Sequence, residues 1–328
     1  MTRTPRIAIR AMVAIGALVA TAALATPAEA GPSRTGGAVA VHDAAPSTSA
    51  QHRATSYWTT ERMRQAIPLD LLDASKSVRP ADVPRGTQRT IAATPRDAGT
   101  LAFPNTGGPW TDGGKVVTTA GRVFFNFDGR TASCSGNAVT STNGSAIMTA
   151  GHCVKYQGSW HTDWVFVPGY HDGQAPYGKW AATQTMATPQ WASNEDINYD
   201  VGAAVVGQLD GQRLTDVVGG QGLAFNTGYN LPMYAFGFPA ADPYDGEKFI
   251  YCSGDSTKDP LFSNDHGLDC DMTGGSSGGP WFTQFDEATG TGLQASVNSF
   301  GYQFLPGVMF GPYFGTDAQN LYDQAQSS

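Results

Sequence analysis

The sequence predicts an all-β protein, built as a sandwich or a barrel, and two observations support this. Its 328 residues include 40 glycines and are 41% apolar but only 15% charged, which is too little charge for a coiled coil or a disordered polyampholyte. From about Gly121 onward, short apolar runs alternate with glycine-rich turns, as is typical of many short strands. The expected strands are 123–127, 146–149, 164–167, 201–206, 233–238, 279–285 and 292–300.

The first element along the chain is a predicted export signal over residues 1–30. Three arginines precede an apolar run over 11–25, and Ala28-Glu29-Ala30 provides the small residues of a cleavage site after Ala30. A membrane anchor is the alternative, but the run is too short to span a bilayer easily. We therefore expect a secreted, extracellular protein with no membrane association after the signal is removed.

The next region, 31–100, is rich in Ala, Thr, Pro, Ser and Arg, with one predicted helix over 59–72. We interpret it as a propeptide whose removal occurs within 90–118; a flexible linker that stays attached is the alternative. Residues 1–100 carry 12 Lys/Arg and 7 Asp/Glu, whereas residues 101–328 carry 8 and 21. The predicted domain 101–328 therefore lacks the basic footprint of a nucleic-acid-binding protein.

The last element is a predicted C-terminal helix. Thr316 can cap it, and Gln319 can complete a capping box. Its apolar face would consist of Ala318, Leu321, Tyr322 and Ala325.

Two segments carry residues suited to nucleophilic catalysis. Segment 149–153 reads TAGHC at the end of an apolar run, and segment 274–280 reads GGSSGGP. A serine is a poor nucleophile unless a neighbouring base takes its proton and a carboxylate orients that base. His152 can be the base for Ser277. The glycines around Ser277 permit a tight turn that points two backbone N–H groups at one place, as an oxyanion hole requires.

The carboxylate of this set is predicted to be Asp200. It directly precedes the apolar run 201–206, so it would lie between the core and the site. Asp196 and Glu195 are followed by polar residues, so we expect them to be solvated loop charges.

Chain order distinguishes between the folds that use such a triad. The motif around Ser277 also fits the nucleophile elbow of α/β-hydrolases, which would make the protein a secreted esterase. Those chains place the histidine after the serine, however, and the last histidine here is His266. A subtilisin-type order needs an aspartate at a strand end before His152, where Asp128 lies in a predicted turn. The order His, Asp200, Ser is that of the chymotrypsin-type arrangement.

The two motifs resemble the signatures of trypsin-like serine peptidases, and the resemblance extends over roughly residues 118–315. It implies two six-stranded antiparallel β-barrels with the active site in the cleft between them. His152 and Asp200 would come from the first barrel and Ser277 from the second. The backbone N–H groups of Gly275 and Ser277 would form the oxyanion hole, and the substrate would be an extended polypeptide.

The sequence is more closely similar to bacterial secreted peptidases of the glutamyl-endopeptidase type, through CDMTGGSS at 270–277 and YAFGFP at 234–239. The resemblance implies that Asp271 lies at the base of the primary specificity pocket. It also implies that Asn298, Ser299 and Gly301 belong to the substrate-binding strand, with Ser299 close to Asp200.

Specificity is predicted from two of these positions. Glutamyl endopeptidases recognise glutamate with a histidine where this chain has Asn298, which carries no charge. A glutamate side chain would meet Asp271 and no cation, so we expect poor cleavage after Glu. At the residue before the scissile bond, we expect Lys or Arg to be slightly favoured over a large apolar residue.

The segment before the nucleophile departs from the pancreatic pattern. Ser276 stands where those enzymes have the aspartate that receives the new N-terminal ammonium on activation. Because a hydroxyl cannot make that ion pair, activation must work differently here.

The four cysteines, in an exported chain, are expected to form two disulfides. Three connectivities are possible, and spacing alone does not choose among them. Cys153 adjoins His152 and Cys134 begins the preceding strand, so we predict Cys134–Cys153 as a clamp on the histidine turn. Cys252–Cys270 would then brace the approach to Ser277.

The sequence shows no metal-ligand spacing, and we expect no cofactor or metal and a monomeric protein. His161, His171 and His266 are predicted to be surface residues. Acidic loops at 242–247 and 255–259 do not match a calcium-binding loop and are expected to be solvated. The leading hypothesis is a secreted serine endopeptidase, and the alternative is a catalytically inert binding protein with the peptidase fold.

Overall fold

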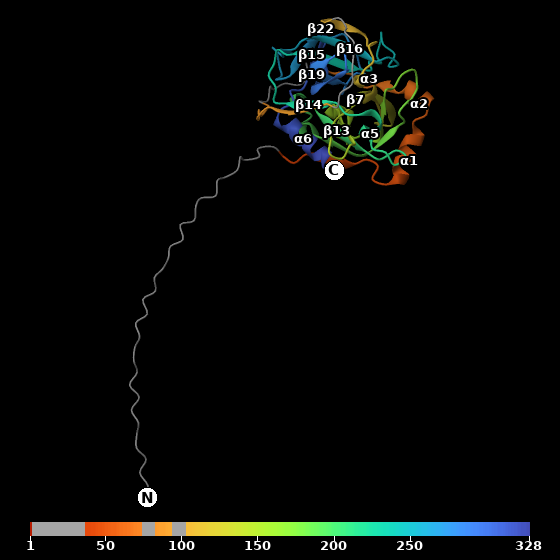
Figure 1. Ribbon diagram of the computed structural model, residues 1–328, viewed down its shortest axis with the longest axis vertical. Coiled ribbons are helices and arrows are strands. Elements are labelled where there is room, and N and C mark those ends of the chain that lie inside the picture. Colours follow the sequence, from red (N-terminus) through yellow and green to blue (C-terminus); the bar gives the residue numbers. More distant parts are fainter. Residues whose placement is uncertain (2–36, 74–82, 94–102) are drawn as a thin grey trace. The chain divides into compact units, whose positions relative to one another are not determined.

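The computed structural model describes Met1 and residues 37–73, 83–93 and 103–328 (Figure 1). Contacts divide the chain into two units, Met1–Thr35 and Gly36–Ser328. The predicted export signal lies outside the described residues, apart from Met1. No helix among the described residues combines the length and apolar character needed to cross a bilayer.

A closed six-stranded antiparallel barrel is built from the first part of the folded unit. The strands follow the order β12-β11-β6-β7-β8-β13, and β13 pairs back with β12 to close the ring. Four of the predicted apolar runs form strands here, and their inward side chains make the largest buried cluster. The bounds are β6 (Ala120–Phe127), β7 (Arg130–Ala138), β8 (Ala146–Thr149), β11 (Thr162–Pro168), β12 (Trp180–Ala187) and β13 (Gly202–Val206).

The second part of the folded unit consists of two sheets, with strand orders β4-β14-β20-β19-β15-β16-β5 and β17-β18-β22-β21-β3. The all-β prediction is thus confirmed. The bounds are β14 (Gly222–Phe225), β15 (Pro232–Gly237), β16 (Ile250–Asp255), β17 (Thr257–Lys258), β18 (His266–Asp269), β19 (Pro280–Asp286), β20 (Thr291–Val297), β21 (Phe300–Tyr302) and β22 (Leu305–Gly311).

Segments that precede β6 pack against both parts. Strand β1 adds to β12, β2 to β7, β3 to β21, β4 to β14 and β5 to β16. The described portion of region 31–100 is therefore folded onto the barrels. The bounds are β1 (Ala40–Asp43), α1 (Thr48–Tyr57), α2 (Thr60–Gln65), β2 (Ile67–Pro68), β3 (Leu72–Asp73), β4 (Arg89–Ile91) and β5 (Asn105–Pro109).

The helix predicted over 59–72 is shorter than expected. Helix α2 ends at Gln65, and the chain then runs extended as β2 and β3. Pro68 explains this, because proline has no N–H for a helical hydrogen bond and its ring clashes with the preceding turn. Helix α1 was not predicted. Trp58, between α1 and α2, is fully buried against Phe124 with ring centroids 5.4 Å apart.

The C-terminal helix α6 (Thr316–Gln326) confirms the prediction, and its predicted apolar face is buried. Its cap was predicted wrongly, because Gly315 is the N-cap and makes no side-chain hydrogen bond. The remaining elements are α3 (Lys115–Thr119), α4 (Pro189–Asn194), α5 (Leu214–Val218), the 3₁₀ turns η2 (Gly151–Cys153) and η3 (Ile197–Tyr199), and the short strands β9 (Lys155–Tyr156) and β10 (Ser159–Trp160).

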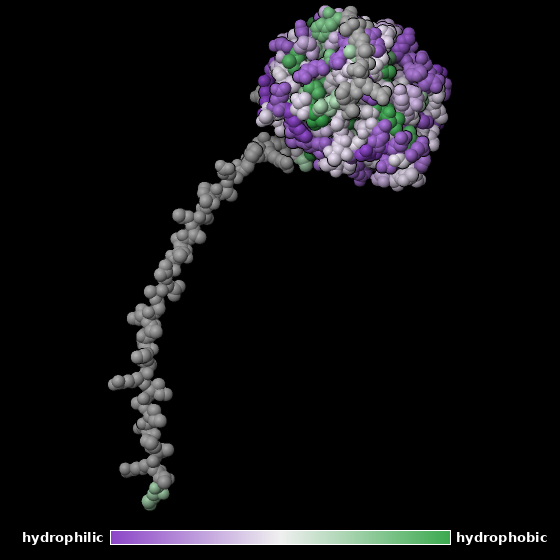
Figure 2. Space-filling model, viewed as in Figure 1, coloured by the Kyte–Doolittle hydropathy of each residue, from purple (hydrophilic) through white to green (hydrophobic). Residues whose placement is uncertain are grey.

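The visible face of the folded unit is a mosaic of hydrophilic residues with small, separate hydrophobic patches (Figure 2). Among the described residues, Val41, Ile67 and Phe103 are large hydrophobic residues that are exposed singly, as is ordinary for a globular protein. Four others form two adjacent pairs, 261–262 and 304–305, which meet at Tyr302: its ring centroid lies 5.9 Å from that of Phe262 and 5.2 Å from that of Phe304.

Two histidines that were predicted to lie at the surface are buried instead. His161 and His266 are both 0% exposed, whereas His171 is exposed as predicted. His266 packs between the rings of Tyr229 and Tyr313. Burial lowers the pKa of His161 to about 4 and that of His266 to about 4, because the charged imidazolium is poorly solvated there. Sequence context alone did not reveal that aromatic neighbours enclose them.

We predict that His266→Phe reduces the pH dependence of stability. His266 has a lower pKa in the fold than in the unfolded chain, so the unfolded state binds the extra proton between about pH 6.5 and 4. The wild type should therefore lose stability as the pH falls through this window, by about 3 kcal/mol from this one group. Urea unfolding at pH 7 and pH 4.5 measures the loss for each protein.

The matched control is His171→Phe, because His171 is exposed. This variant should lose as much stability on acidification as the wild type does. An equal loss in His266→Phe would contradict the prediction.

Candidate active site

The histidine turn is built by β8 and η2. Strand β8 ends at Thr149, and the 3₁₀ turn then places His152 at the edge of the first barrel. Gly151 is required here, since a Cβ would lie 2.6 Å from the Trp191 ring and 2.9 Å from Asp200 Oδ1. The missing side chain lets the carboxylate approach the backbone of the histidine turn.

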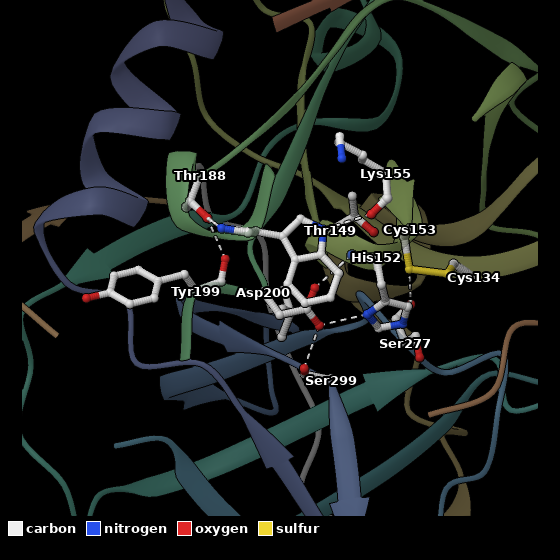
Figure 3. A network of polar contacts seen from close by, with 12 residues as sticks. Cys134, Thr149, His152, Cys153, Lys155, Thr188, Tyr199, Asp200, Ser277 and Ser299 are labelled. Atoms are coloured by element: carbon white, nitrogen blue, oxygen red, sulfur yellow. Dashed lines mark hydrogen bonds and ion pairs between the residues drawn. A yellow bond between two sulfur atoms is a disulfide. The ribbon is translucent and has the colours of Figure 1, made fainter. Parts of the chain in front are cut away.

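Asp200 binds the histidine at two points (Figure 3). His152 Nδ1 donates to Asp200 Oδ2 at 2.7 Å, and the His152 backbone N–H donates to Asp200 Oδ1 at 2.7 Å. Ser299 Oγ also donates to Asp200 Oδ2, at 2.5 Å. Asp200 is completely buried, so these contacts replace the water that a carboxylate would otherwise bind. The structure therefore brings His152, Asp200 and Ser299 together as the sequence suggested.

The neighbouring acids have structural roles. Asp196 accepts a hydrogen bond from the backbone N–H of Asn198 as the cap of η3. Glu195 accepts one from the backbone N–H of Gly158. Neither contact involves the histidine.

The nucleophile turn contains two glycines with positive φ. Gly275 has a φ of 94° and Gly278 a φ of 79°, a region that other residues rarely adopt. A Cβ on Gly278 would lie 2.1 Å from Thr149 Oγ1, so this turn presses directly against the histidine strand. The Ser135 backbone N–H donates to the Ser277 carbonyl at 2.7 Å, and Ser135 Oγ donates to the Gly275 carbonyl at 3.0 Å.

Ser276 holds the turn without an ion pair. It is buried, and its Oγ donates to the Thr273 carbonyl at 2.7 Å. The hydroxyl thus closes the turn from within, at the position where the pancreatic pattern has an aspartate.

Asn298 requires a correction, because it was predicted to bind substrate. The residue is 0% exposed, and its amide nitrogen donates to the carbonyls of Phe236 and Ser276 at 2.8 and 2.9 Å. Its oxygen accepts a hydrogen bond from Trp281 Nε1 at 2.6 Å. Asn298 therefore supports the nucleophile turn from behind and does not line the cleft.

A cavity of about 730 Å³ lies beside this turn. Asp271 and Gly301 line it, as the sequence suggested. The side chain of Asp271 is not enclosed, however: the residue is exposed, and its Oδ1 accepts a hydrogen bond from Tyr244 at 2.7 Å. The prediction that Asp271 is a buried carboxylate at the base of a pocket is therefore wrong, because this residue lies in contact with solvent.

Both predicted disulfides are present. Cys134–Cys153 joins β7 to the histidine turn, and Cys252–Cys270 joins β16 to the segment that leads to Ser277. Within the described residues, the group whose geometry would suit a metal consists of Cys134, Cys153 and His152. Since both cysteines are in the disulfide, they offer no thiolate to a metal ion.

His161 is a supporting residue that sequence reasoning missed. Its Nε2 donates to the His152 carbonyl at 2.8 Å, and its ring stacks on Phe125 with centroids 4.2 Å apart. The sequence offered one signal of its burial, which is that His161 lies close to the start of an apolar strand. His161 fixes the backbone of the histidine turn from the barrel interior.

The buried role of Asn298 leads to a prediction for Asn298→Leu. The substitution keeps the volume but removes three buried hydrogen bonds. It leaves the Trp281 N–H without a partner and takes one donor from each of the Phe236 and Ser276 carbonyls, of which Ser276 keeps the Gly279 N–H. Each unsatisfied buried group costs about 1–3 kcal/mol, so the free energy of unfolding should fall by several kcal/mol. Urea denaturation measures it, and Asn194→Leu at the exposed end of α4 is the matched control. A loss no larger than that of the control would contradict the buried role.

Comparison with known proteins identifies the fold. The protease Anisep from Arthrobacter nicotinovorans is 46% identical, with a TM-score of 0.61 over 64% of this chain and 96% of its own. The thermostable serine protease AL20, from an extremophilic microorganism, is 40% identical, with a TM-score of 0.62 over 65% of this chain and 99% of its own.

A Glu endopeptidase with 17% identity and a TM-score of 0.55 shares the fold, over 70% of this chain and 100% of its own. No protein-family model and no curated protein matches the chain. At 40–46% identity and near-complete coverage of Anisep and AL20, the resemblance seen in the motifs is confirmed. The chain belongs to the trypsin-like serine peptidases and is a serine endopeptidase.

Proposed function

We propose that this peptidase is secreted and that it cleaves extended polypeptides through His152, Asp200 and Ser277. The observation that supports this most strongly is the double contact of Asp200 with His152. The contact fixes the ring so that Nδ1 carries the proton and Nε2 is the free base. A catalytically inert relative would have no need to bury a carboxylate for this purpose.

The reaction would follow from these positions. His152 Nε2 removes the proton from Ser277 Oγ as the oxygen attacks the carbonyl carbon of the substrate. The N–H groups of Gly275 and Ser277 stabilise the oxyanion, and Asp200 stabilises the imidazolium. The imidazolium then protonates the leaving amine. Water, activated by the same imidazole, hydrolyses the acyl-enzyme and restores Ser277.

The organisation of the precursor is part of the proposal. Residues 1–30 would be an export signal and 31–100 a propeptide, with the final cleavage within 90–118. Anisep and AL20 each align over about two thirds of this chain while nearly all of their own length is covered. Two disulfides fit the oxidising compartment that export implies.

The triad is tested by substitution in the processed protein. Ser277→Ala and His152→Ala should each lower kcat by about a millionfold, because triad members act as a unit. Asp200→Asn should cost about ten-thousandfold, because the amide favours the wrong histidine tautomer. Hydrolysis of a peptide substrate and labelling by a fluorophosphonate measure the effects.

Ser193→Ala, an exposed serine in α4, is the control and should leave both readings unchanged. Normal labelling of Ser277→Ala would show that another residue is the nucleophile.

Specificity against acidic side chains is tested with peptides that differ only at the residue before the scissile bond. The cavity walls over 270–274 and 301–309 contain Asp271 and no Lys, Arg or His, and the cation that lines the cavity elsewhere, Arg130, is an exposed residue at the start of β7. A glutamate there would face a like charge, so kcat/KM should be at least about tenfold lower for Glu than for Gln, or about 1.4 kcal/mol. The Asp271→Asn variant should show a smaller difference in kcat/KM between the Glu and Gln peptides. A preference for Glu over Gln in the wild type would refute the assignment of Asp271 to the wall of the primary specificity pocket.

A further inference from the structure

Residues 67–73 of the chain cross the active-site cleft as an extended strand. Strand β2 pairs in parallel with β7, and strand β3 pairs in parallel with β21, which leads on from Ser299. The Leu69 N–H donates to the Ser133 carbonyl at 3.0 Å, and the Leu72 N–H donates to the Ser299 carbonyl at 3.3 Å. The segment therefore binds as an added strand at two sheet edges, which is how extended peptides are commonly recognised.

The oxyanion site is already occupied by this segment. The Gly275 N–H, one of the two proposed oxyanion donors, donates to the Leu69 carbonyl at 2.9 Å. The next residue, Asp70, packs closely on the same turn: a Cβ added to Gly274 would lie only 3.1 Å from the Asp70 Cα. Ser277 Oγ and His152 Nε2 are both buried, and neither has a hydrogen-bond partner among the described residues. The reactive atoms are thus covered and unengaged.

The cavity next to Asp271 is lined on one side by residues 67–72 of the same segment, which include the aliphatic residue Leu71. Leu71 packs against the apolar cluster of the second part of the fold. Three members of that cluster, Cys270, Met272 and Met309, also line the cavity. The exposed Asp271 carboxylate makes its hydrogen bond to Tyr244. The primary pocket, as built here, is suited to a leucine-like side chain.

The segment runs in the direction that prevents cleavage. A leaving amine must be protonated by His152, so the C-terminal part of a cleaved peptide has to leave along the histidine side, where Cys134–Cys153 ties β7 to the histidine turn. In this segment the residues before Leu69 lie along β7, and those after it pass to β21. The Asp70 nitrogen therefore points to the wrong side for protonation.

We propose that residues 67–73 are an internal ligand of the substrate cleft, bound opposite to the substrate direction, and that they keep the precursor latent. The ligand class is an extended peptide that offers a carbonyl to the Gly275 N–H and an aliphatic side chain two residues later. This inference rests on the proposed function of Ser277. It also accounts for latency without an ammonium partner at Ser276.

The preceding helices anchor the ligand to the first barrel. The fully buried Trp58 donates from Nε1 to the Asp163 carbonyl at 2.6 Å, and Lys179 Nζ donates to the Trp58 carbonyl at 2.7 Å. Arg64 lies 3.8 Å from Glu247. Attachment at this anchor keeps the effective concentration of residues 67–73 at the cleft high, because rebinding is intramolecular.

The first test compares fluorophosphonate labelling of full-length and processed protein, with the two forms resolved on a gel. The full-length wild type should label at least about 100-fold more slowly, since an occupied cleft leaves about 1% of molecules open. Leu71→Asp, which places a charge in the apolar pocket, should label far faster as the full-length chain. Val41→Asp is the matched control, because Val41 is an exposed aliphatic residue of β1, and it should label like the wild type.

The outcomes separate the two proposals. Processed protein that does not label would refute the proposed function of Ser277. Equal labelling of full-length and processed wild type would refute the internal ligand while leaving that function intact. The comparison needs no variant, so misfolding of Leu71→Asp does not affect it.

The binding direction is tested by mapping the first cleavages in dilute precursor. A substrate-like segment would be cut within its own molecule between Leu69 and Asp70, at a rate independent of protein concentration. We expect no such fragment, and expect early cuts elsewhere to accelerate with concentration. A concentration-independent cut at Leu69–Asp70 would overturn the reversed direction.

Discussion

The contact between the nucleophile turn and the histidine strand is the constraint on which the rest of the site depends. Ser277 belongs to one part of the fold, and His152 and Asp200 belong to the other. Gly278 lets the two backbones meet, and the Ser135 N–H to Ser277 carbonyl hydrogen bond sets their register. Catalytic groups must be placed to well under an ångström to act together. A side chain on Gly278 would push the Ser277 turn away from Thr149 and the histidine turn.

The site is supported by buried polar groups that hydrogen-bond to its backbone and to the buried carboxylate. Asn298 holds the nucleophile turn, His161 holds the backbone of the histidine turn, and Ser299 completes the partners of Asp200. In a low-dielectric interior such groups are costly when unpaired and rigid when fully paired. Rigidity explains how a hydroxyl at Ser276 can close the turn that needs an ion pair in the pancreatic pattern.

Local sequence was sufficient for features that depend on a few adjacent residues. The contact between His152 and Asp200, the strands of the first barrel and both disulfides follow from short motifs, their order and their adjacency. The misassigned residues depend on distant partners. Asn298 faces inward because Trp281 and two carbonyls meet it there, and His266 is enclosed by Tyr229 and Tyr313. The crossing of the cleft by residues 67–73 is likewise invisible to composition, because it is a long-range pairing.

The parallel pairing of β2 and β3 also bears on the chemistry of an emptied cleft. If residues 67–73 leave on the proposed maturation, the carbonyls of Ser133 and Ser299 and the N–H of Gly275 lose their hydrogen bonds to this segment and must bind water. These edges are unpaired strands, which other chains can join indiscriminately. In the newly made chain they are covered by a neighbouring segment of the same molecule. The groove that a peptidase must leave open to its substrates is therefore protected from association with other unfolded chains during folding.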